Sequence, residues 1–203
     1  MSTLRNLGIA AALLLSMAVA GDDATVPAQA KVWVSGTSTV QPWKCAAKAV
    51  DARLAGLPSE PLTLANVTSA SGGSVRIDVA ALDCANDTMN EHLRNALQAK
   101  DHPQIRFELK SYQLAAAQDG KAKLAIDGAL ILGGTTKAVR LDATATELAG
   151  GKIGITGEYA LDMKDYSLKP PELFFGAMKV DPKVVVGFEL KLAAPAPVAA
   201  GQR

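Results

Sequence analysis

The side chains best suited to metal chemistry are two histidines, His92 and His102, and two cysteines, Cys45 and Cys84. A zinc site needs a compact set of His, Cys or carboxylate ligands, whereas the two histidines lie ten positions apart, at opposite ends of one segment. Cys84 and His92 could approach each other, but Cys45 is the better partner for Cys84. The residues therefore predict neither a metal site nor a cofactor.

Residues that could support nucleophilic or acid–base catalysis are also poorly placed. The chain has no Gly-x-Ser-x-Gly motif, and residues 71–74 (Ser-Gly-Gly-Ser) have the composition of a turn. Residues 133–137 superficially resemble a phosphate-binding loop, but their spacing is wrong and they join two strands instead of leading into a helix. The carboxylates of Asp162, Asp165 and Glu172 are scattered in or near loops. We therefore expect that the protein is not an enzyme.

The N-terminal residues have the pattern of a secretory signal peptide. Arg5 provides the positive charge, residues 7–19 form an uncharged apolar run, and residues 18–20 (Ala-Val-Ala) match a small-x-small cleavage site. The run is shorter than the roughly 20 apolar residues of a membrane-spanning helix. A signal peptide over residues 1–20 therefore predicts a periplasmic or secreted protein with no stable membrane anchor, while a second small-x-small site at residues 28–30 and an uncleaved N-terminal anchor remain alternatives.

The two cysteines fit such a compartment, because exported proteins can form disulfides. We favour a bridge between Cys45 and Cys84, which would close a loop of about 40 residues and stabilise the fold by about 4 kcal/mol in the chain-entropy model. The alternative is two separate buried thiols, which behave as small hydrophobic side chains.

The composition argues against nucleic acid as a partner and indicates a single globular domain. The chain has 203 residues, of which 49% are hydrophobic and 4% aromatic, and its formal net charge is +1. Lysine and arginine are interleaved with aspartate and glutamate, whereas nucleic-acid binding normally needs clustered cations. We expect one domain over residues 31–193, a loose lead-in over residues 21–30 and a disordered Ala/Pro-rich tail over residues 194–203.

Most of this domain alternates apolar and polar residues with period two, as half-buried strands do. Short turns such as Gly133-Gly134 separate the runs and indicate hairpins. An antiparallel barrel of about eight strands would remove the exposed edges of such a sheet. The clear runs are residues 75–79, 105–110, 124–132, 139–146, 153–155 and 184–192, and the weaker ones are residues 31–35, 46–54 and 62–68.

One segment, at about residues 87–100, is predicted to be a helix. Thr88 and Glu91 have the spacing of a capping box, and His102-Pro103 ends the pattern because the residue before proline avoids the helical region. One face of the helix would carry Met89, Leu93, Ala96 and Leu97. The predicted fold class is therefore all-β, an antiparallel barrel with one short helix.

The barrel interior is predicted to carry small aliphatic side chains and few rings. A barrel of about eight strands can be filled by its own side chains or can hold one ligand. The pattern alone does not decide between a filled core and an apolar cavity.

Several motifs resemble the YceI-like family of exported lipid-binding proteins. Residues 89–94 (Met-Asn-Glu-His-Leu-Arg), followed by Pro103-x-Ile105-x-Phe107, are similar to the family's helix and the strand after it. Residues 124–137 resemble a family hairpin, and the closing strand over residues 184–192 also fits. The resemblance covers roughly residues 31–193.

The N-terminal third departs from the commonest pattern of the family. Trp43-Lys44-Cys45 and Asp83-Cys84 match a branch with paired cysteines. This resemblance strengthens the prediction of the Cys45–Cys84 bridge, and it leaves open whether the cavity mouth matches that of other members.

The resemblance implies a lipocalin-like barrel with an elongated apolar cavity and, as partner, a polyisoprenoid or isoprenoid quinone that is bound for transport, storage or stress protection. An interaction module with a filled core and an enzyme acting on a lipid-like substrate are the alternatives, and the sequence leaves a homodimer open. The residues predicted to line the cavity, each of which could also be a simple core residue, are Val75, Ile77, Val79, Ile105, Phe107, Leu124, Ile126, Leu130, Val139, Leu141, Val186 and Phe188.

Overall fold

The computed structural model describes residues 26–173 and 178–195. The predicted signal peptide, residues 21–25 of the predicted lead-in and residues 196–203 of the predicted tail lie outside this part of the chain. The strands are β1 (Val26–Thr37), β2 (Pro42–Ala47), β3 (Asp51–Ala55), β4 (Gly72–Asp78), β5 (Leu82–Asp83), β6 (Gln104–Leu114), β7 (Lys121–Leu132), β8 (Thr135–Leu148), β9 (Lys152–Asp162), β10 (Glu172–Leu173), β11 (Met178–Lys179) and β12 (Lys183–Ala193). The helices are α1 (Asp87–Ala96) and the short 3-10 turns η1 (Val67–Ser69), η2 (Val79–Ala81) and η3 (Met163–Tyr166).

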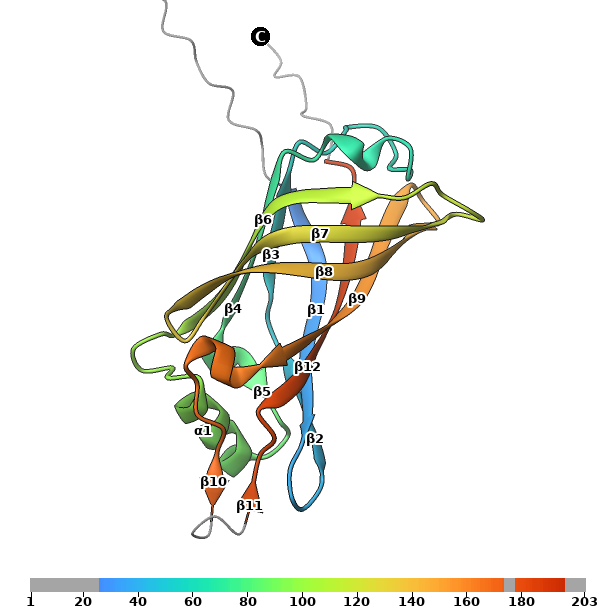
Figure 1. The fold of residues 1–203 in the computed structure, drawn as a ribbon. Helices are drawn as coiled ribbons and strands as arrows, with labels where there is room; N and C mark the ends of the chain where they lie inside the picture. Colours follow the sequence, from blue (N-terminus) through green and yellow to red (C-terminus); the bar gives the residue numbers. More distant parts are fainter. Residues whose placement is uncertain (1–25, 174–177, 196–203) are drawn as a thin grey trace, which may run out of the picture.

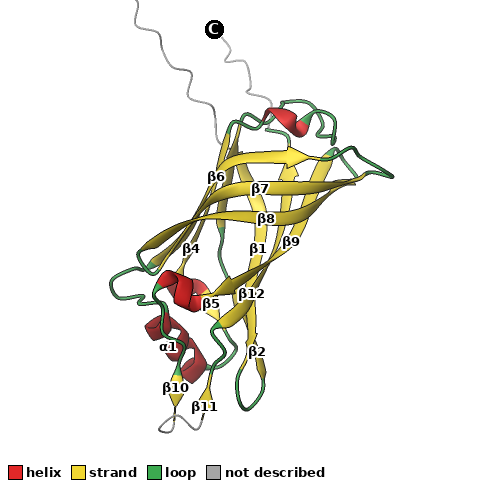
Figure 2. Cartoon of the chain, viewed as in Figure 1, coloured by secondary structure: helices red, strands yellow, loops and turns green. Residues whose placement is uncertain are grey.

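Eight of these strands close into an antiparallel barrel, which confirms the predicted fold class (Figures 1 and 2). The order around the wall is β12, β9, β8, β7, β6, β4, β3 and β1, and β1 pairs again with β12. Because β1 is long, it also pairs with β2, which extends the sheet beyond the barrel and carries β5. Strands β10 and β11 form a separate two-stranded ribbon.

The hairpin predicted between β7 and β8 turns at Gly133 and Gly134. Both residues have positive φ, 53° and 75°, which glycine adopts without steric cost. A two-residue hairpin turn needs such φ angles, because its twist must match the right-handed twist of the two strands. The turn sets a register in which Val139 lies opposite Gly128 and Leu141 opposite Ile126.

The N-terminal strands differ from the prediction at three places. β1 begins at Val26, so residues 26–30, predicted as a loose lead-in, belong to the barrel. The run predicted over residues 46–54 is two strands, β2 and β3, because the chain leaves β1 after Ala46 and returns to it at Ala52. β4 ends at Asp78, and Val79, predicted to continue it, begins η2.

The weak strand predicted over residues 62–68 is wrong, because this segment is a loop that contains the start of η1. The Thr63 backbone N–H donates to Asn66 Oδ1 at 2.8 Å, and Asn66 Nδ2 donates to the Pro61 carbonyl at 3.0 Å. Such local side-chain bonds compete with a strand ladder. We call residues 56–71 the cap loop, since it covers the barrel end opposite α1 (Figure 1).

The predicted helix is present, but it ends at Ala96, earlier than the predicted residue 100, and it begins with a different cap. Asn86 is extended (φ −154°, ψ 122°) and its side chain accepts a hydrogen bond from the Met89 backbone N–H at 2.9 Å. This places Thr88 already inside the first turn, so the predicted Thr88–Glu91 capping box is wrong. The predicted apolar face is confirmed for three residues that pack into the barrel end, namely Leu93, Ala96 and Leu97.

Fully buried apolar side chains gather in two clusters at the two ends of the barrel. The cap cluster is formed by side chains of the cap loop and of the barrel end that it covers, namely Leu62, Leu64, Val67, Ala122, Leu124, Ala143, Ala145, Ile153, Phe188 and Leu192. The helix cluster lies beside α1, η2 and η3 and contains Ile77, Val79, Leu82, Leu97, Leu132, Leu161, Met163, Tyr166, Leu168 and Val184. Both ends of the barrel are therefore packed.

Cys45 and Cys84 form a disulfide, which confirms the favoured pairing and excludes two free buried thiols. The bridge ties β2 to the segment between β5 and α1. Asn90, buried on α1, accepts from the Cys84 backbone N–H at 2.7 Å and donates to Asp83 Oδ1 at 3.0 Å. Lys48 Nζ completes this group at 3.1 Å from Asp83 Oδ2.

Among the helices of the described residues, none combines the length and the apolar character that crossing a bilayer requires.

Candidate functional site

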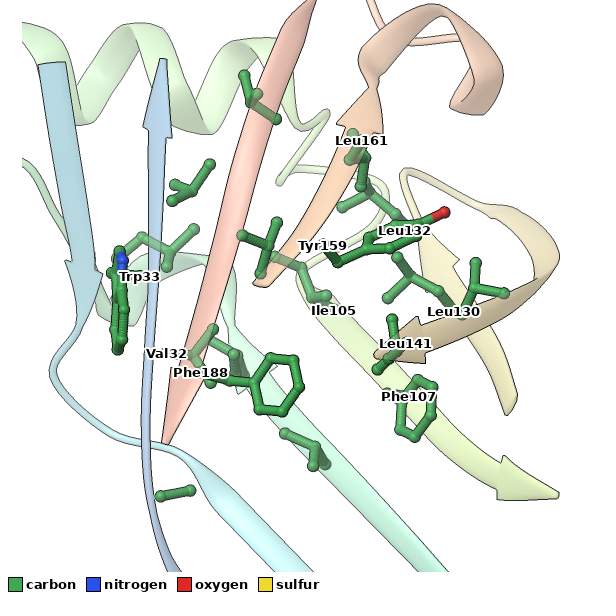
Figure 3. A pocket seen from close by; sticks show the side chains of 18 of the residues that line it. Val32, Trp33, Ile105, Phe107, Leu130, Leu132, Leu141, Tyr159, Leu161 and Phe188 are labelled. Carbon is green, nitrogen blue, oxygen red and sulfur yellow. The ribbon is translucent and has the colours of Figure 1, made fainter. Parts of the chain in front are cut away.

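The described part of the barrel encloses an apolar cavity of about 250 Å³ between the cap cluster and the helix cluster. Side chains of all eight barrel strands form its wall, and Leu93 of α1 and Leu97 at the C-cap of α1 contribute at one end. Figure 3 shows part of this wall, with Phe107 and Phe188 as its phenylalanine rings.

The burial pattern distinguishes this cavity from a filled core. Val32, Val75, Ile105 and Leu141 point inward by strand alternation, yet each is only half-buried. Inward-facing residues at the two ends of the same sheet, such as Ile153, are fully buried. Half-burial of inward-facing aliphatic groups means that they border an internal space instead of packing against side chains.

The structure brings ten of the twelve predicted lining residues together on the cavity wall. Val79 is not among them, because it lies in η2 and is packed within the helix cluster. Leu124 is also excluded, since it is buried in the cap cluster. Contact of any of these residues with a ligand stays a prediction. The ten on the wall are Val75, Ile77, Ile105, Phe107, Ile126, Leu130, Val139, Leu141, Val186 and Phe188.

Sequence reasoning missed several residues that line the cavity near the helix cluster. Tyr159 and Leu161 continue the alternation that starts at Ile153, so a longer reading of that strand could have found them. Met163 and Leu168 lie in and after η3, where no periodic signal exists.

The cavity wall has a seam beside β1. β1 pairs with β3 through residues 26–28 and with β2 through residues 33–37, so residues 29–32 have no strand partner on that side among the described residues. Trp33, Arg53 and Ser74, which border the cavity here, face outward by strand alternation. The cavity therefore approaches the surface at this seam.

Charged groups are scarce around the cavity. Arg53 is the one charged residue among the described lining residues, and its Nε lies 3.0 Å from Asp51 Oδ1 in an exposed ion pair. At the opposite end, Tyr159 lines the wall, and it packs against the helix cluster, in which Tyr166 is 2% exposed. Burial, and after it the nearby Tyr159, raise the pKa of Tyr166 well above its ordinary value.

Neither histidine is placed for chemistry in this cavity. His92 lies on α1, and His102 packs against the β7–β8 turn, where a Cβ at Gly134 would lie 2.5 Å from the imidazole Cε1. The described residues contain no group of three or more His, Cys, Asp or Glu side chains that could hold a metal ion. The arrangement of the site suits burial of an apolar molecule.

A comparison with protein-family models matches residues 25–192 to the YceI-like domain. This match covers most of the chain and includes every strand of the barrel. A comparison with curated proteins finds no match.

Solved structures share the fold at low sequence identity. BcnA from Burkholderia cenocepacia is 20% identical, with a TM-score of 0.65 over 81% of this chain and 96% of that chain. A polyisoprenoid binding domain from Saccharophagus degradans, implicated in plant cell wall breakdown, is 12% identical, with a TM-score of 0.64 over 83% of this chain and 98% of that chain. A YCEI protein from Campylobacter jejuni is 19% identical, with a TM-score of 0.55 over 75% and 85% of the two chains.

Proposed function

Because the chain belongs to the YceI-like family, we propose that it is a binding protein that holds an apolar lipid inside its barrel. The lipid would be a polyisoprenoid or an isoprenoid quinone, and the protein would transport it, store it or use it in stress protection without a catalytic step. The observation that carries this proposal is the apolar cavity between two packed ends of the barrel.

The physical chemistry of the wall supports an isoprenoid. Removing apolar surface from water contributes roughly 25 cal/mol per Å², so a methyl-branched hydrocarbon chain needs no polar partner to be retained. The half-buried side chains of Val32, Ile105 and Leu141 would lose their remaining exposure when such a chain is bound. The structural neighbour from Saccharophagus degradans, described as a polyisoprenoid binding domain, supports the same ligand class.

The size of the cavity constrains how a long chain would bind. A volume of about 250 Å³ lies just below the roughly 300–1,000 Å³ that is usual for ligand pockets. A long polyisoprenoid would therefore have to push the strands of the wall apart or leave part of its chain outside the cavity. The seam beside residues 29–32 of β1 is one place where either could happen without breaking hydrogen bonds between strands.

We further propose that the protein acts in the periplasm or outside the cell after removal of residues 1–20. The Cys45–Cys84 disulfide supports this location, because such bridges persist in oxidising compartments.

Native mass spectrometry of protein purified from its own host tests the binding function. We expect an additional mass of an apolar lipid on the wild type. Val186→Trp should abolish it, because Val186 lines the cavity between Val34 and Tyr159 of the neighbouring strands. Val185→Trp is the matched control, since Val185 is 37% exposed on the outer face.

Circular dichroism and thermal melting would establish that both tryptophan variants fold. Leu141→Phe, a smaller addition to the same wall, replaces Val186→Trp if that variant does not fold. A wild-type barrel that is empty from its host, and that takes up no polyprenyl lipid in vitro, would overturn the proposal.

A further inference from the structure

Arg76 of β4 and Arg106 of β6 lie directly opposite each other on the outer wall of the barrel. Both side chains are exposed, and they alternate with the inward-facing Ile77 and Ile105. Residues in such cross-strand positions have Cβ atoms about 4.5–5.5 Å apart, and like charges there are destabilising. Because arginine does not lose its proton in proteins, the two guanidinium groups repel each other. An anion bound between them would remove this repulsion.

The carboxylates that adjoin these two arginines already have other partners. One lies directly opposite Arg76 on β3, and the other two follow Arg76 and Arg106 two positions along their own strands. Their contacts are Asp51 Oδ1 with Arg53 Nε at 3.0 Å, Asp78 Oδ1 with Gln104 Nε2 at 3.0 Å and Glu108 Oε2 with Lys110 Nζ at 3.6 Å. Among the described residues, neither Arg76 nor Arg106 has an ion pair or a side-chain hydrogen bond. Both guanidinium groups are therefore available to a ligand.

The two arginines belong to the part of the wall where the seam begins. β1 leaves β3 after Ala28, which lies opposite Ala52. Asp51 is the next residue of β3, and the row of residues that starts there continues across the wall with Arg76 and Arg106. This row is therefore the first one at which β1 has no partner on β3.

The head group of an isoprenoid ligand fits this place better than the cavity itself. The cavity wall is almost entirely hydrocarbon, and both ends of the barrel are packed. A polar head group inside it would lose its hydration without gaining a partner, which is costly. A volume of about 250 Å³ also leaves little room beyond the chain. The head group therefore belongs outside, and the cavity approaches the surface at the seam.

The two arginines select the class of this head group. A guanidinium donates two parallel N–H bonds to a phosphate, which makes such pairs both strong and specific. A phosphate or diphosphate has enough oxygens and negative charge to bind Arg76 and Arg106 together, whereas a quinone presents only neutral carbonyl oxygens. Arg53 borders the cavity nearby, and its exposed ion pair with Asp51 is cheap to exchange for the same anion.

We propose that Arg76 and Arg106, assisted by Arg53, bind the phosphate or diphosphate head group of an isoprenoid on the outer wall. The hydrocarbon chain passes from there through the seam and lies along the apolar wall of the cavity. This inference rests on the proposed lipid-binding function and adds to it the class of the head group and the orientation of the ligand.

Farnesyl diphosphate, farnesol and inorganic diphosphate separate the contributions of the head group and the chain. The wild type should bind farnesyl diphosphate about tenfold more tightly than farnesol, the order of one good hydrogen bond to a charged group. This ratio should fall when the salt concentration rises from about 50 mM to about 500 mM, since exposed charges are screened. Inorganic diphosphate should bind more weakly than farnesyl diphosphate, because it lacks the chain.

Arg76→Gln and Arg106→Gln should each lower the ratio of farnesyl diphosphate to farnesol affinity, and the double variant should bring it close to one. The affinity for farnesol should not change, because its chain contacts the cavity wall and not the arginines. Each single variant should melt at the same temperature as the wild type or higher, since it removes one of two charges that repel each other.

Arg140→Gln is the matched control, because it removes the same charge from another part of the outer wall. Arg140 is exposed on β8, which β7 and β6 separate from β4, and its Nη1 lies 3.2 Å from Asp127 Oδ2. This substitution should leave the ratio unchanged.

Four results would each overturn the head-group site. They are equal wild-type affinity for farnesyl diphosphate and farnesol, a preference for the diphosphate that survives the double substitution, an equal loss of preference in Arg140→Gln, and a lower melting temperature of the single variants at Arg76 or Arg106. Inorganic diphosphate that binds as tightly as farnesyl diphosphate would also overturn it, because the site would then take a free anion. All of these results leave the lipid-binding function standing. Failure of the wild type to bind either farnesyl compound would instead count against the lipid-binding function itself.

Discussion

Phe188 of β12 lies directly opposite Gly157 of β9, and its ring occupies the space that a side chain at Gly157 would need. A Cβ at Gly157 would be 2.5 Å from Phe188 Cζ and 2.8 Å from the Asp142 carbonyl oxygen. Trp33 covers Gly187, which lies directly opposite it, in the same way, and Phe107 covers Gly128, which lies diagonally across from it on β7. Aromatic side chains that cover a glycine on a neighbouring strand compensate for its lack of a side chain. These pairs help to hold the rings against the wall.

Gly157→Ala should therefore destabilise the protein. The new methyl group must displace both the Phe188 ring and the backbone at Asp142, and such overpacking costs roughly 1–3 kcal/mol. Chemical denaturation would measure the loss. The displaced ring should also reduce lipid uptake, because Phe188 is part of the cavity wall.

Gly72→Ala provides the control for this substitution, since a Cβ there has no atom within 4 Å. It should be neutral or slightly stabilising. Equal stability of the two alanine variants would contradict the packing role assigned to Gly157.

Strands with strict alternation were predictable from the sequence because one face meets the interior and the other meets water. β12 is the clearest case, with Val184, Val186 and Phe188 pointing inward as predicted. The pairing of Phe188 with Gly157 was not predictable, because it depends on the register between β9 and β12. A single strand carries no information on its partner's register.

The segments that sequence reasoning missed either lack a regular spacing of apolar residues or have the spacing of an element that they do not form. Leu62 and Leu64 alternate like a strand, but Asn66 and Thr63 fold the chain into the cap loop. Tyr166 lies in a 3-10 turn of four residues, where neither periodicity applies. The burial of Tyr166 in the helix cluster therefore becomes apparent only in three dimensions.

Removing the Cys45–Cys84 bridge should lower stability without abolishing the barrel. The bridge spans 39 positions, and closing a loop of that length contributes about 4 kcal/mol in the chain-entropy model. In a domain of this size that corresponds to a fall in melting temperature on the order of 10 °C. Thermal melting of a Cys45→Ala/Cys84→Ala variant would measure it.

A thiol reagent provides the matching control. The native protein should show no reactive thiol from Cys45 or Cys84 until it is reduced. Two thiols reacting without reductant, or an unchanged melting temperature in the double variant, would contradict the stabilising role of the bridge.

Protonation of the Asp83 carboxylate should lower the stability of the fold at acid pH. Hydrogen bonds from Asn90 and then from Lys48 hold the pKa of Asp83 below its ordinary value of 3.8. Because the folded-state pKa is the lower one, the stabilisation is fully present above the unfolded value and is lost as the pH falls through the folded value. Melting temperatures recorded from about pH 5 to about pH 2 should fall less steeply for Asp83→Asn than for the wild type.

Lys48→Ala tests the origin of this effect. It should reduce the acid dependence only in part, since Asn90 is the larger cause of the shift. An acid dependence in Asp83→Asn as steep as in the wild type would rule out Asp83 as its source.

Tyr112 should control how readily the cap loop opens. Its hydroxyl donates to the Val67 carbonyl and accepts from the Ala70 backbone N–H at 3.1 Å. Tyr112→Phe leaves both backbone groups without this partner, a change that costs about 1–3 kcal/mol when they stay buried. Hydrogen exchange of residues 62–71 should therefore become faster, while β12 retains its protection because its ladder with β9 is untouched.

Tyr159→Phe is the matched control for the cap loop, because it removes a phenol from the other end of the cavity. Exchange in residues 62–71 should then equal that of the wild type. Faster exchange in both variants would indicate a general loss of stability, and unchanged exchange in Tyr112→Phe would mean that other contacts hold the loop closed. One such contact is made by the Leu64 backbone N–H, which donates to Glu147 Oε1 at 2.8 Å. Glu147→Ala, which removes the acceptor, combined with Tyr112→Phe should therefore open the loop further than either substitution alone, because the two bonds hold the loop to different strands.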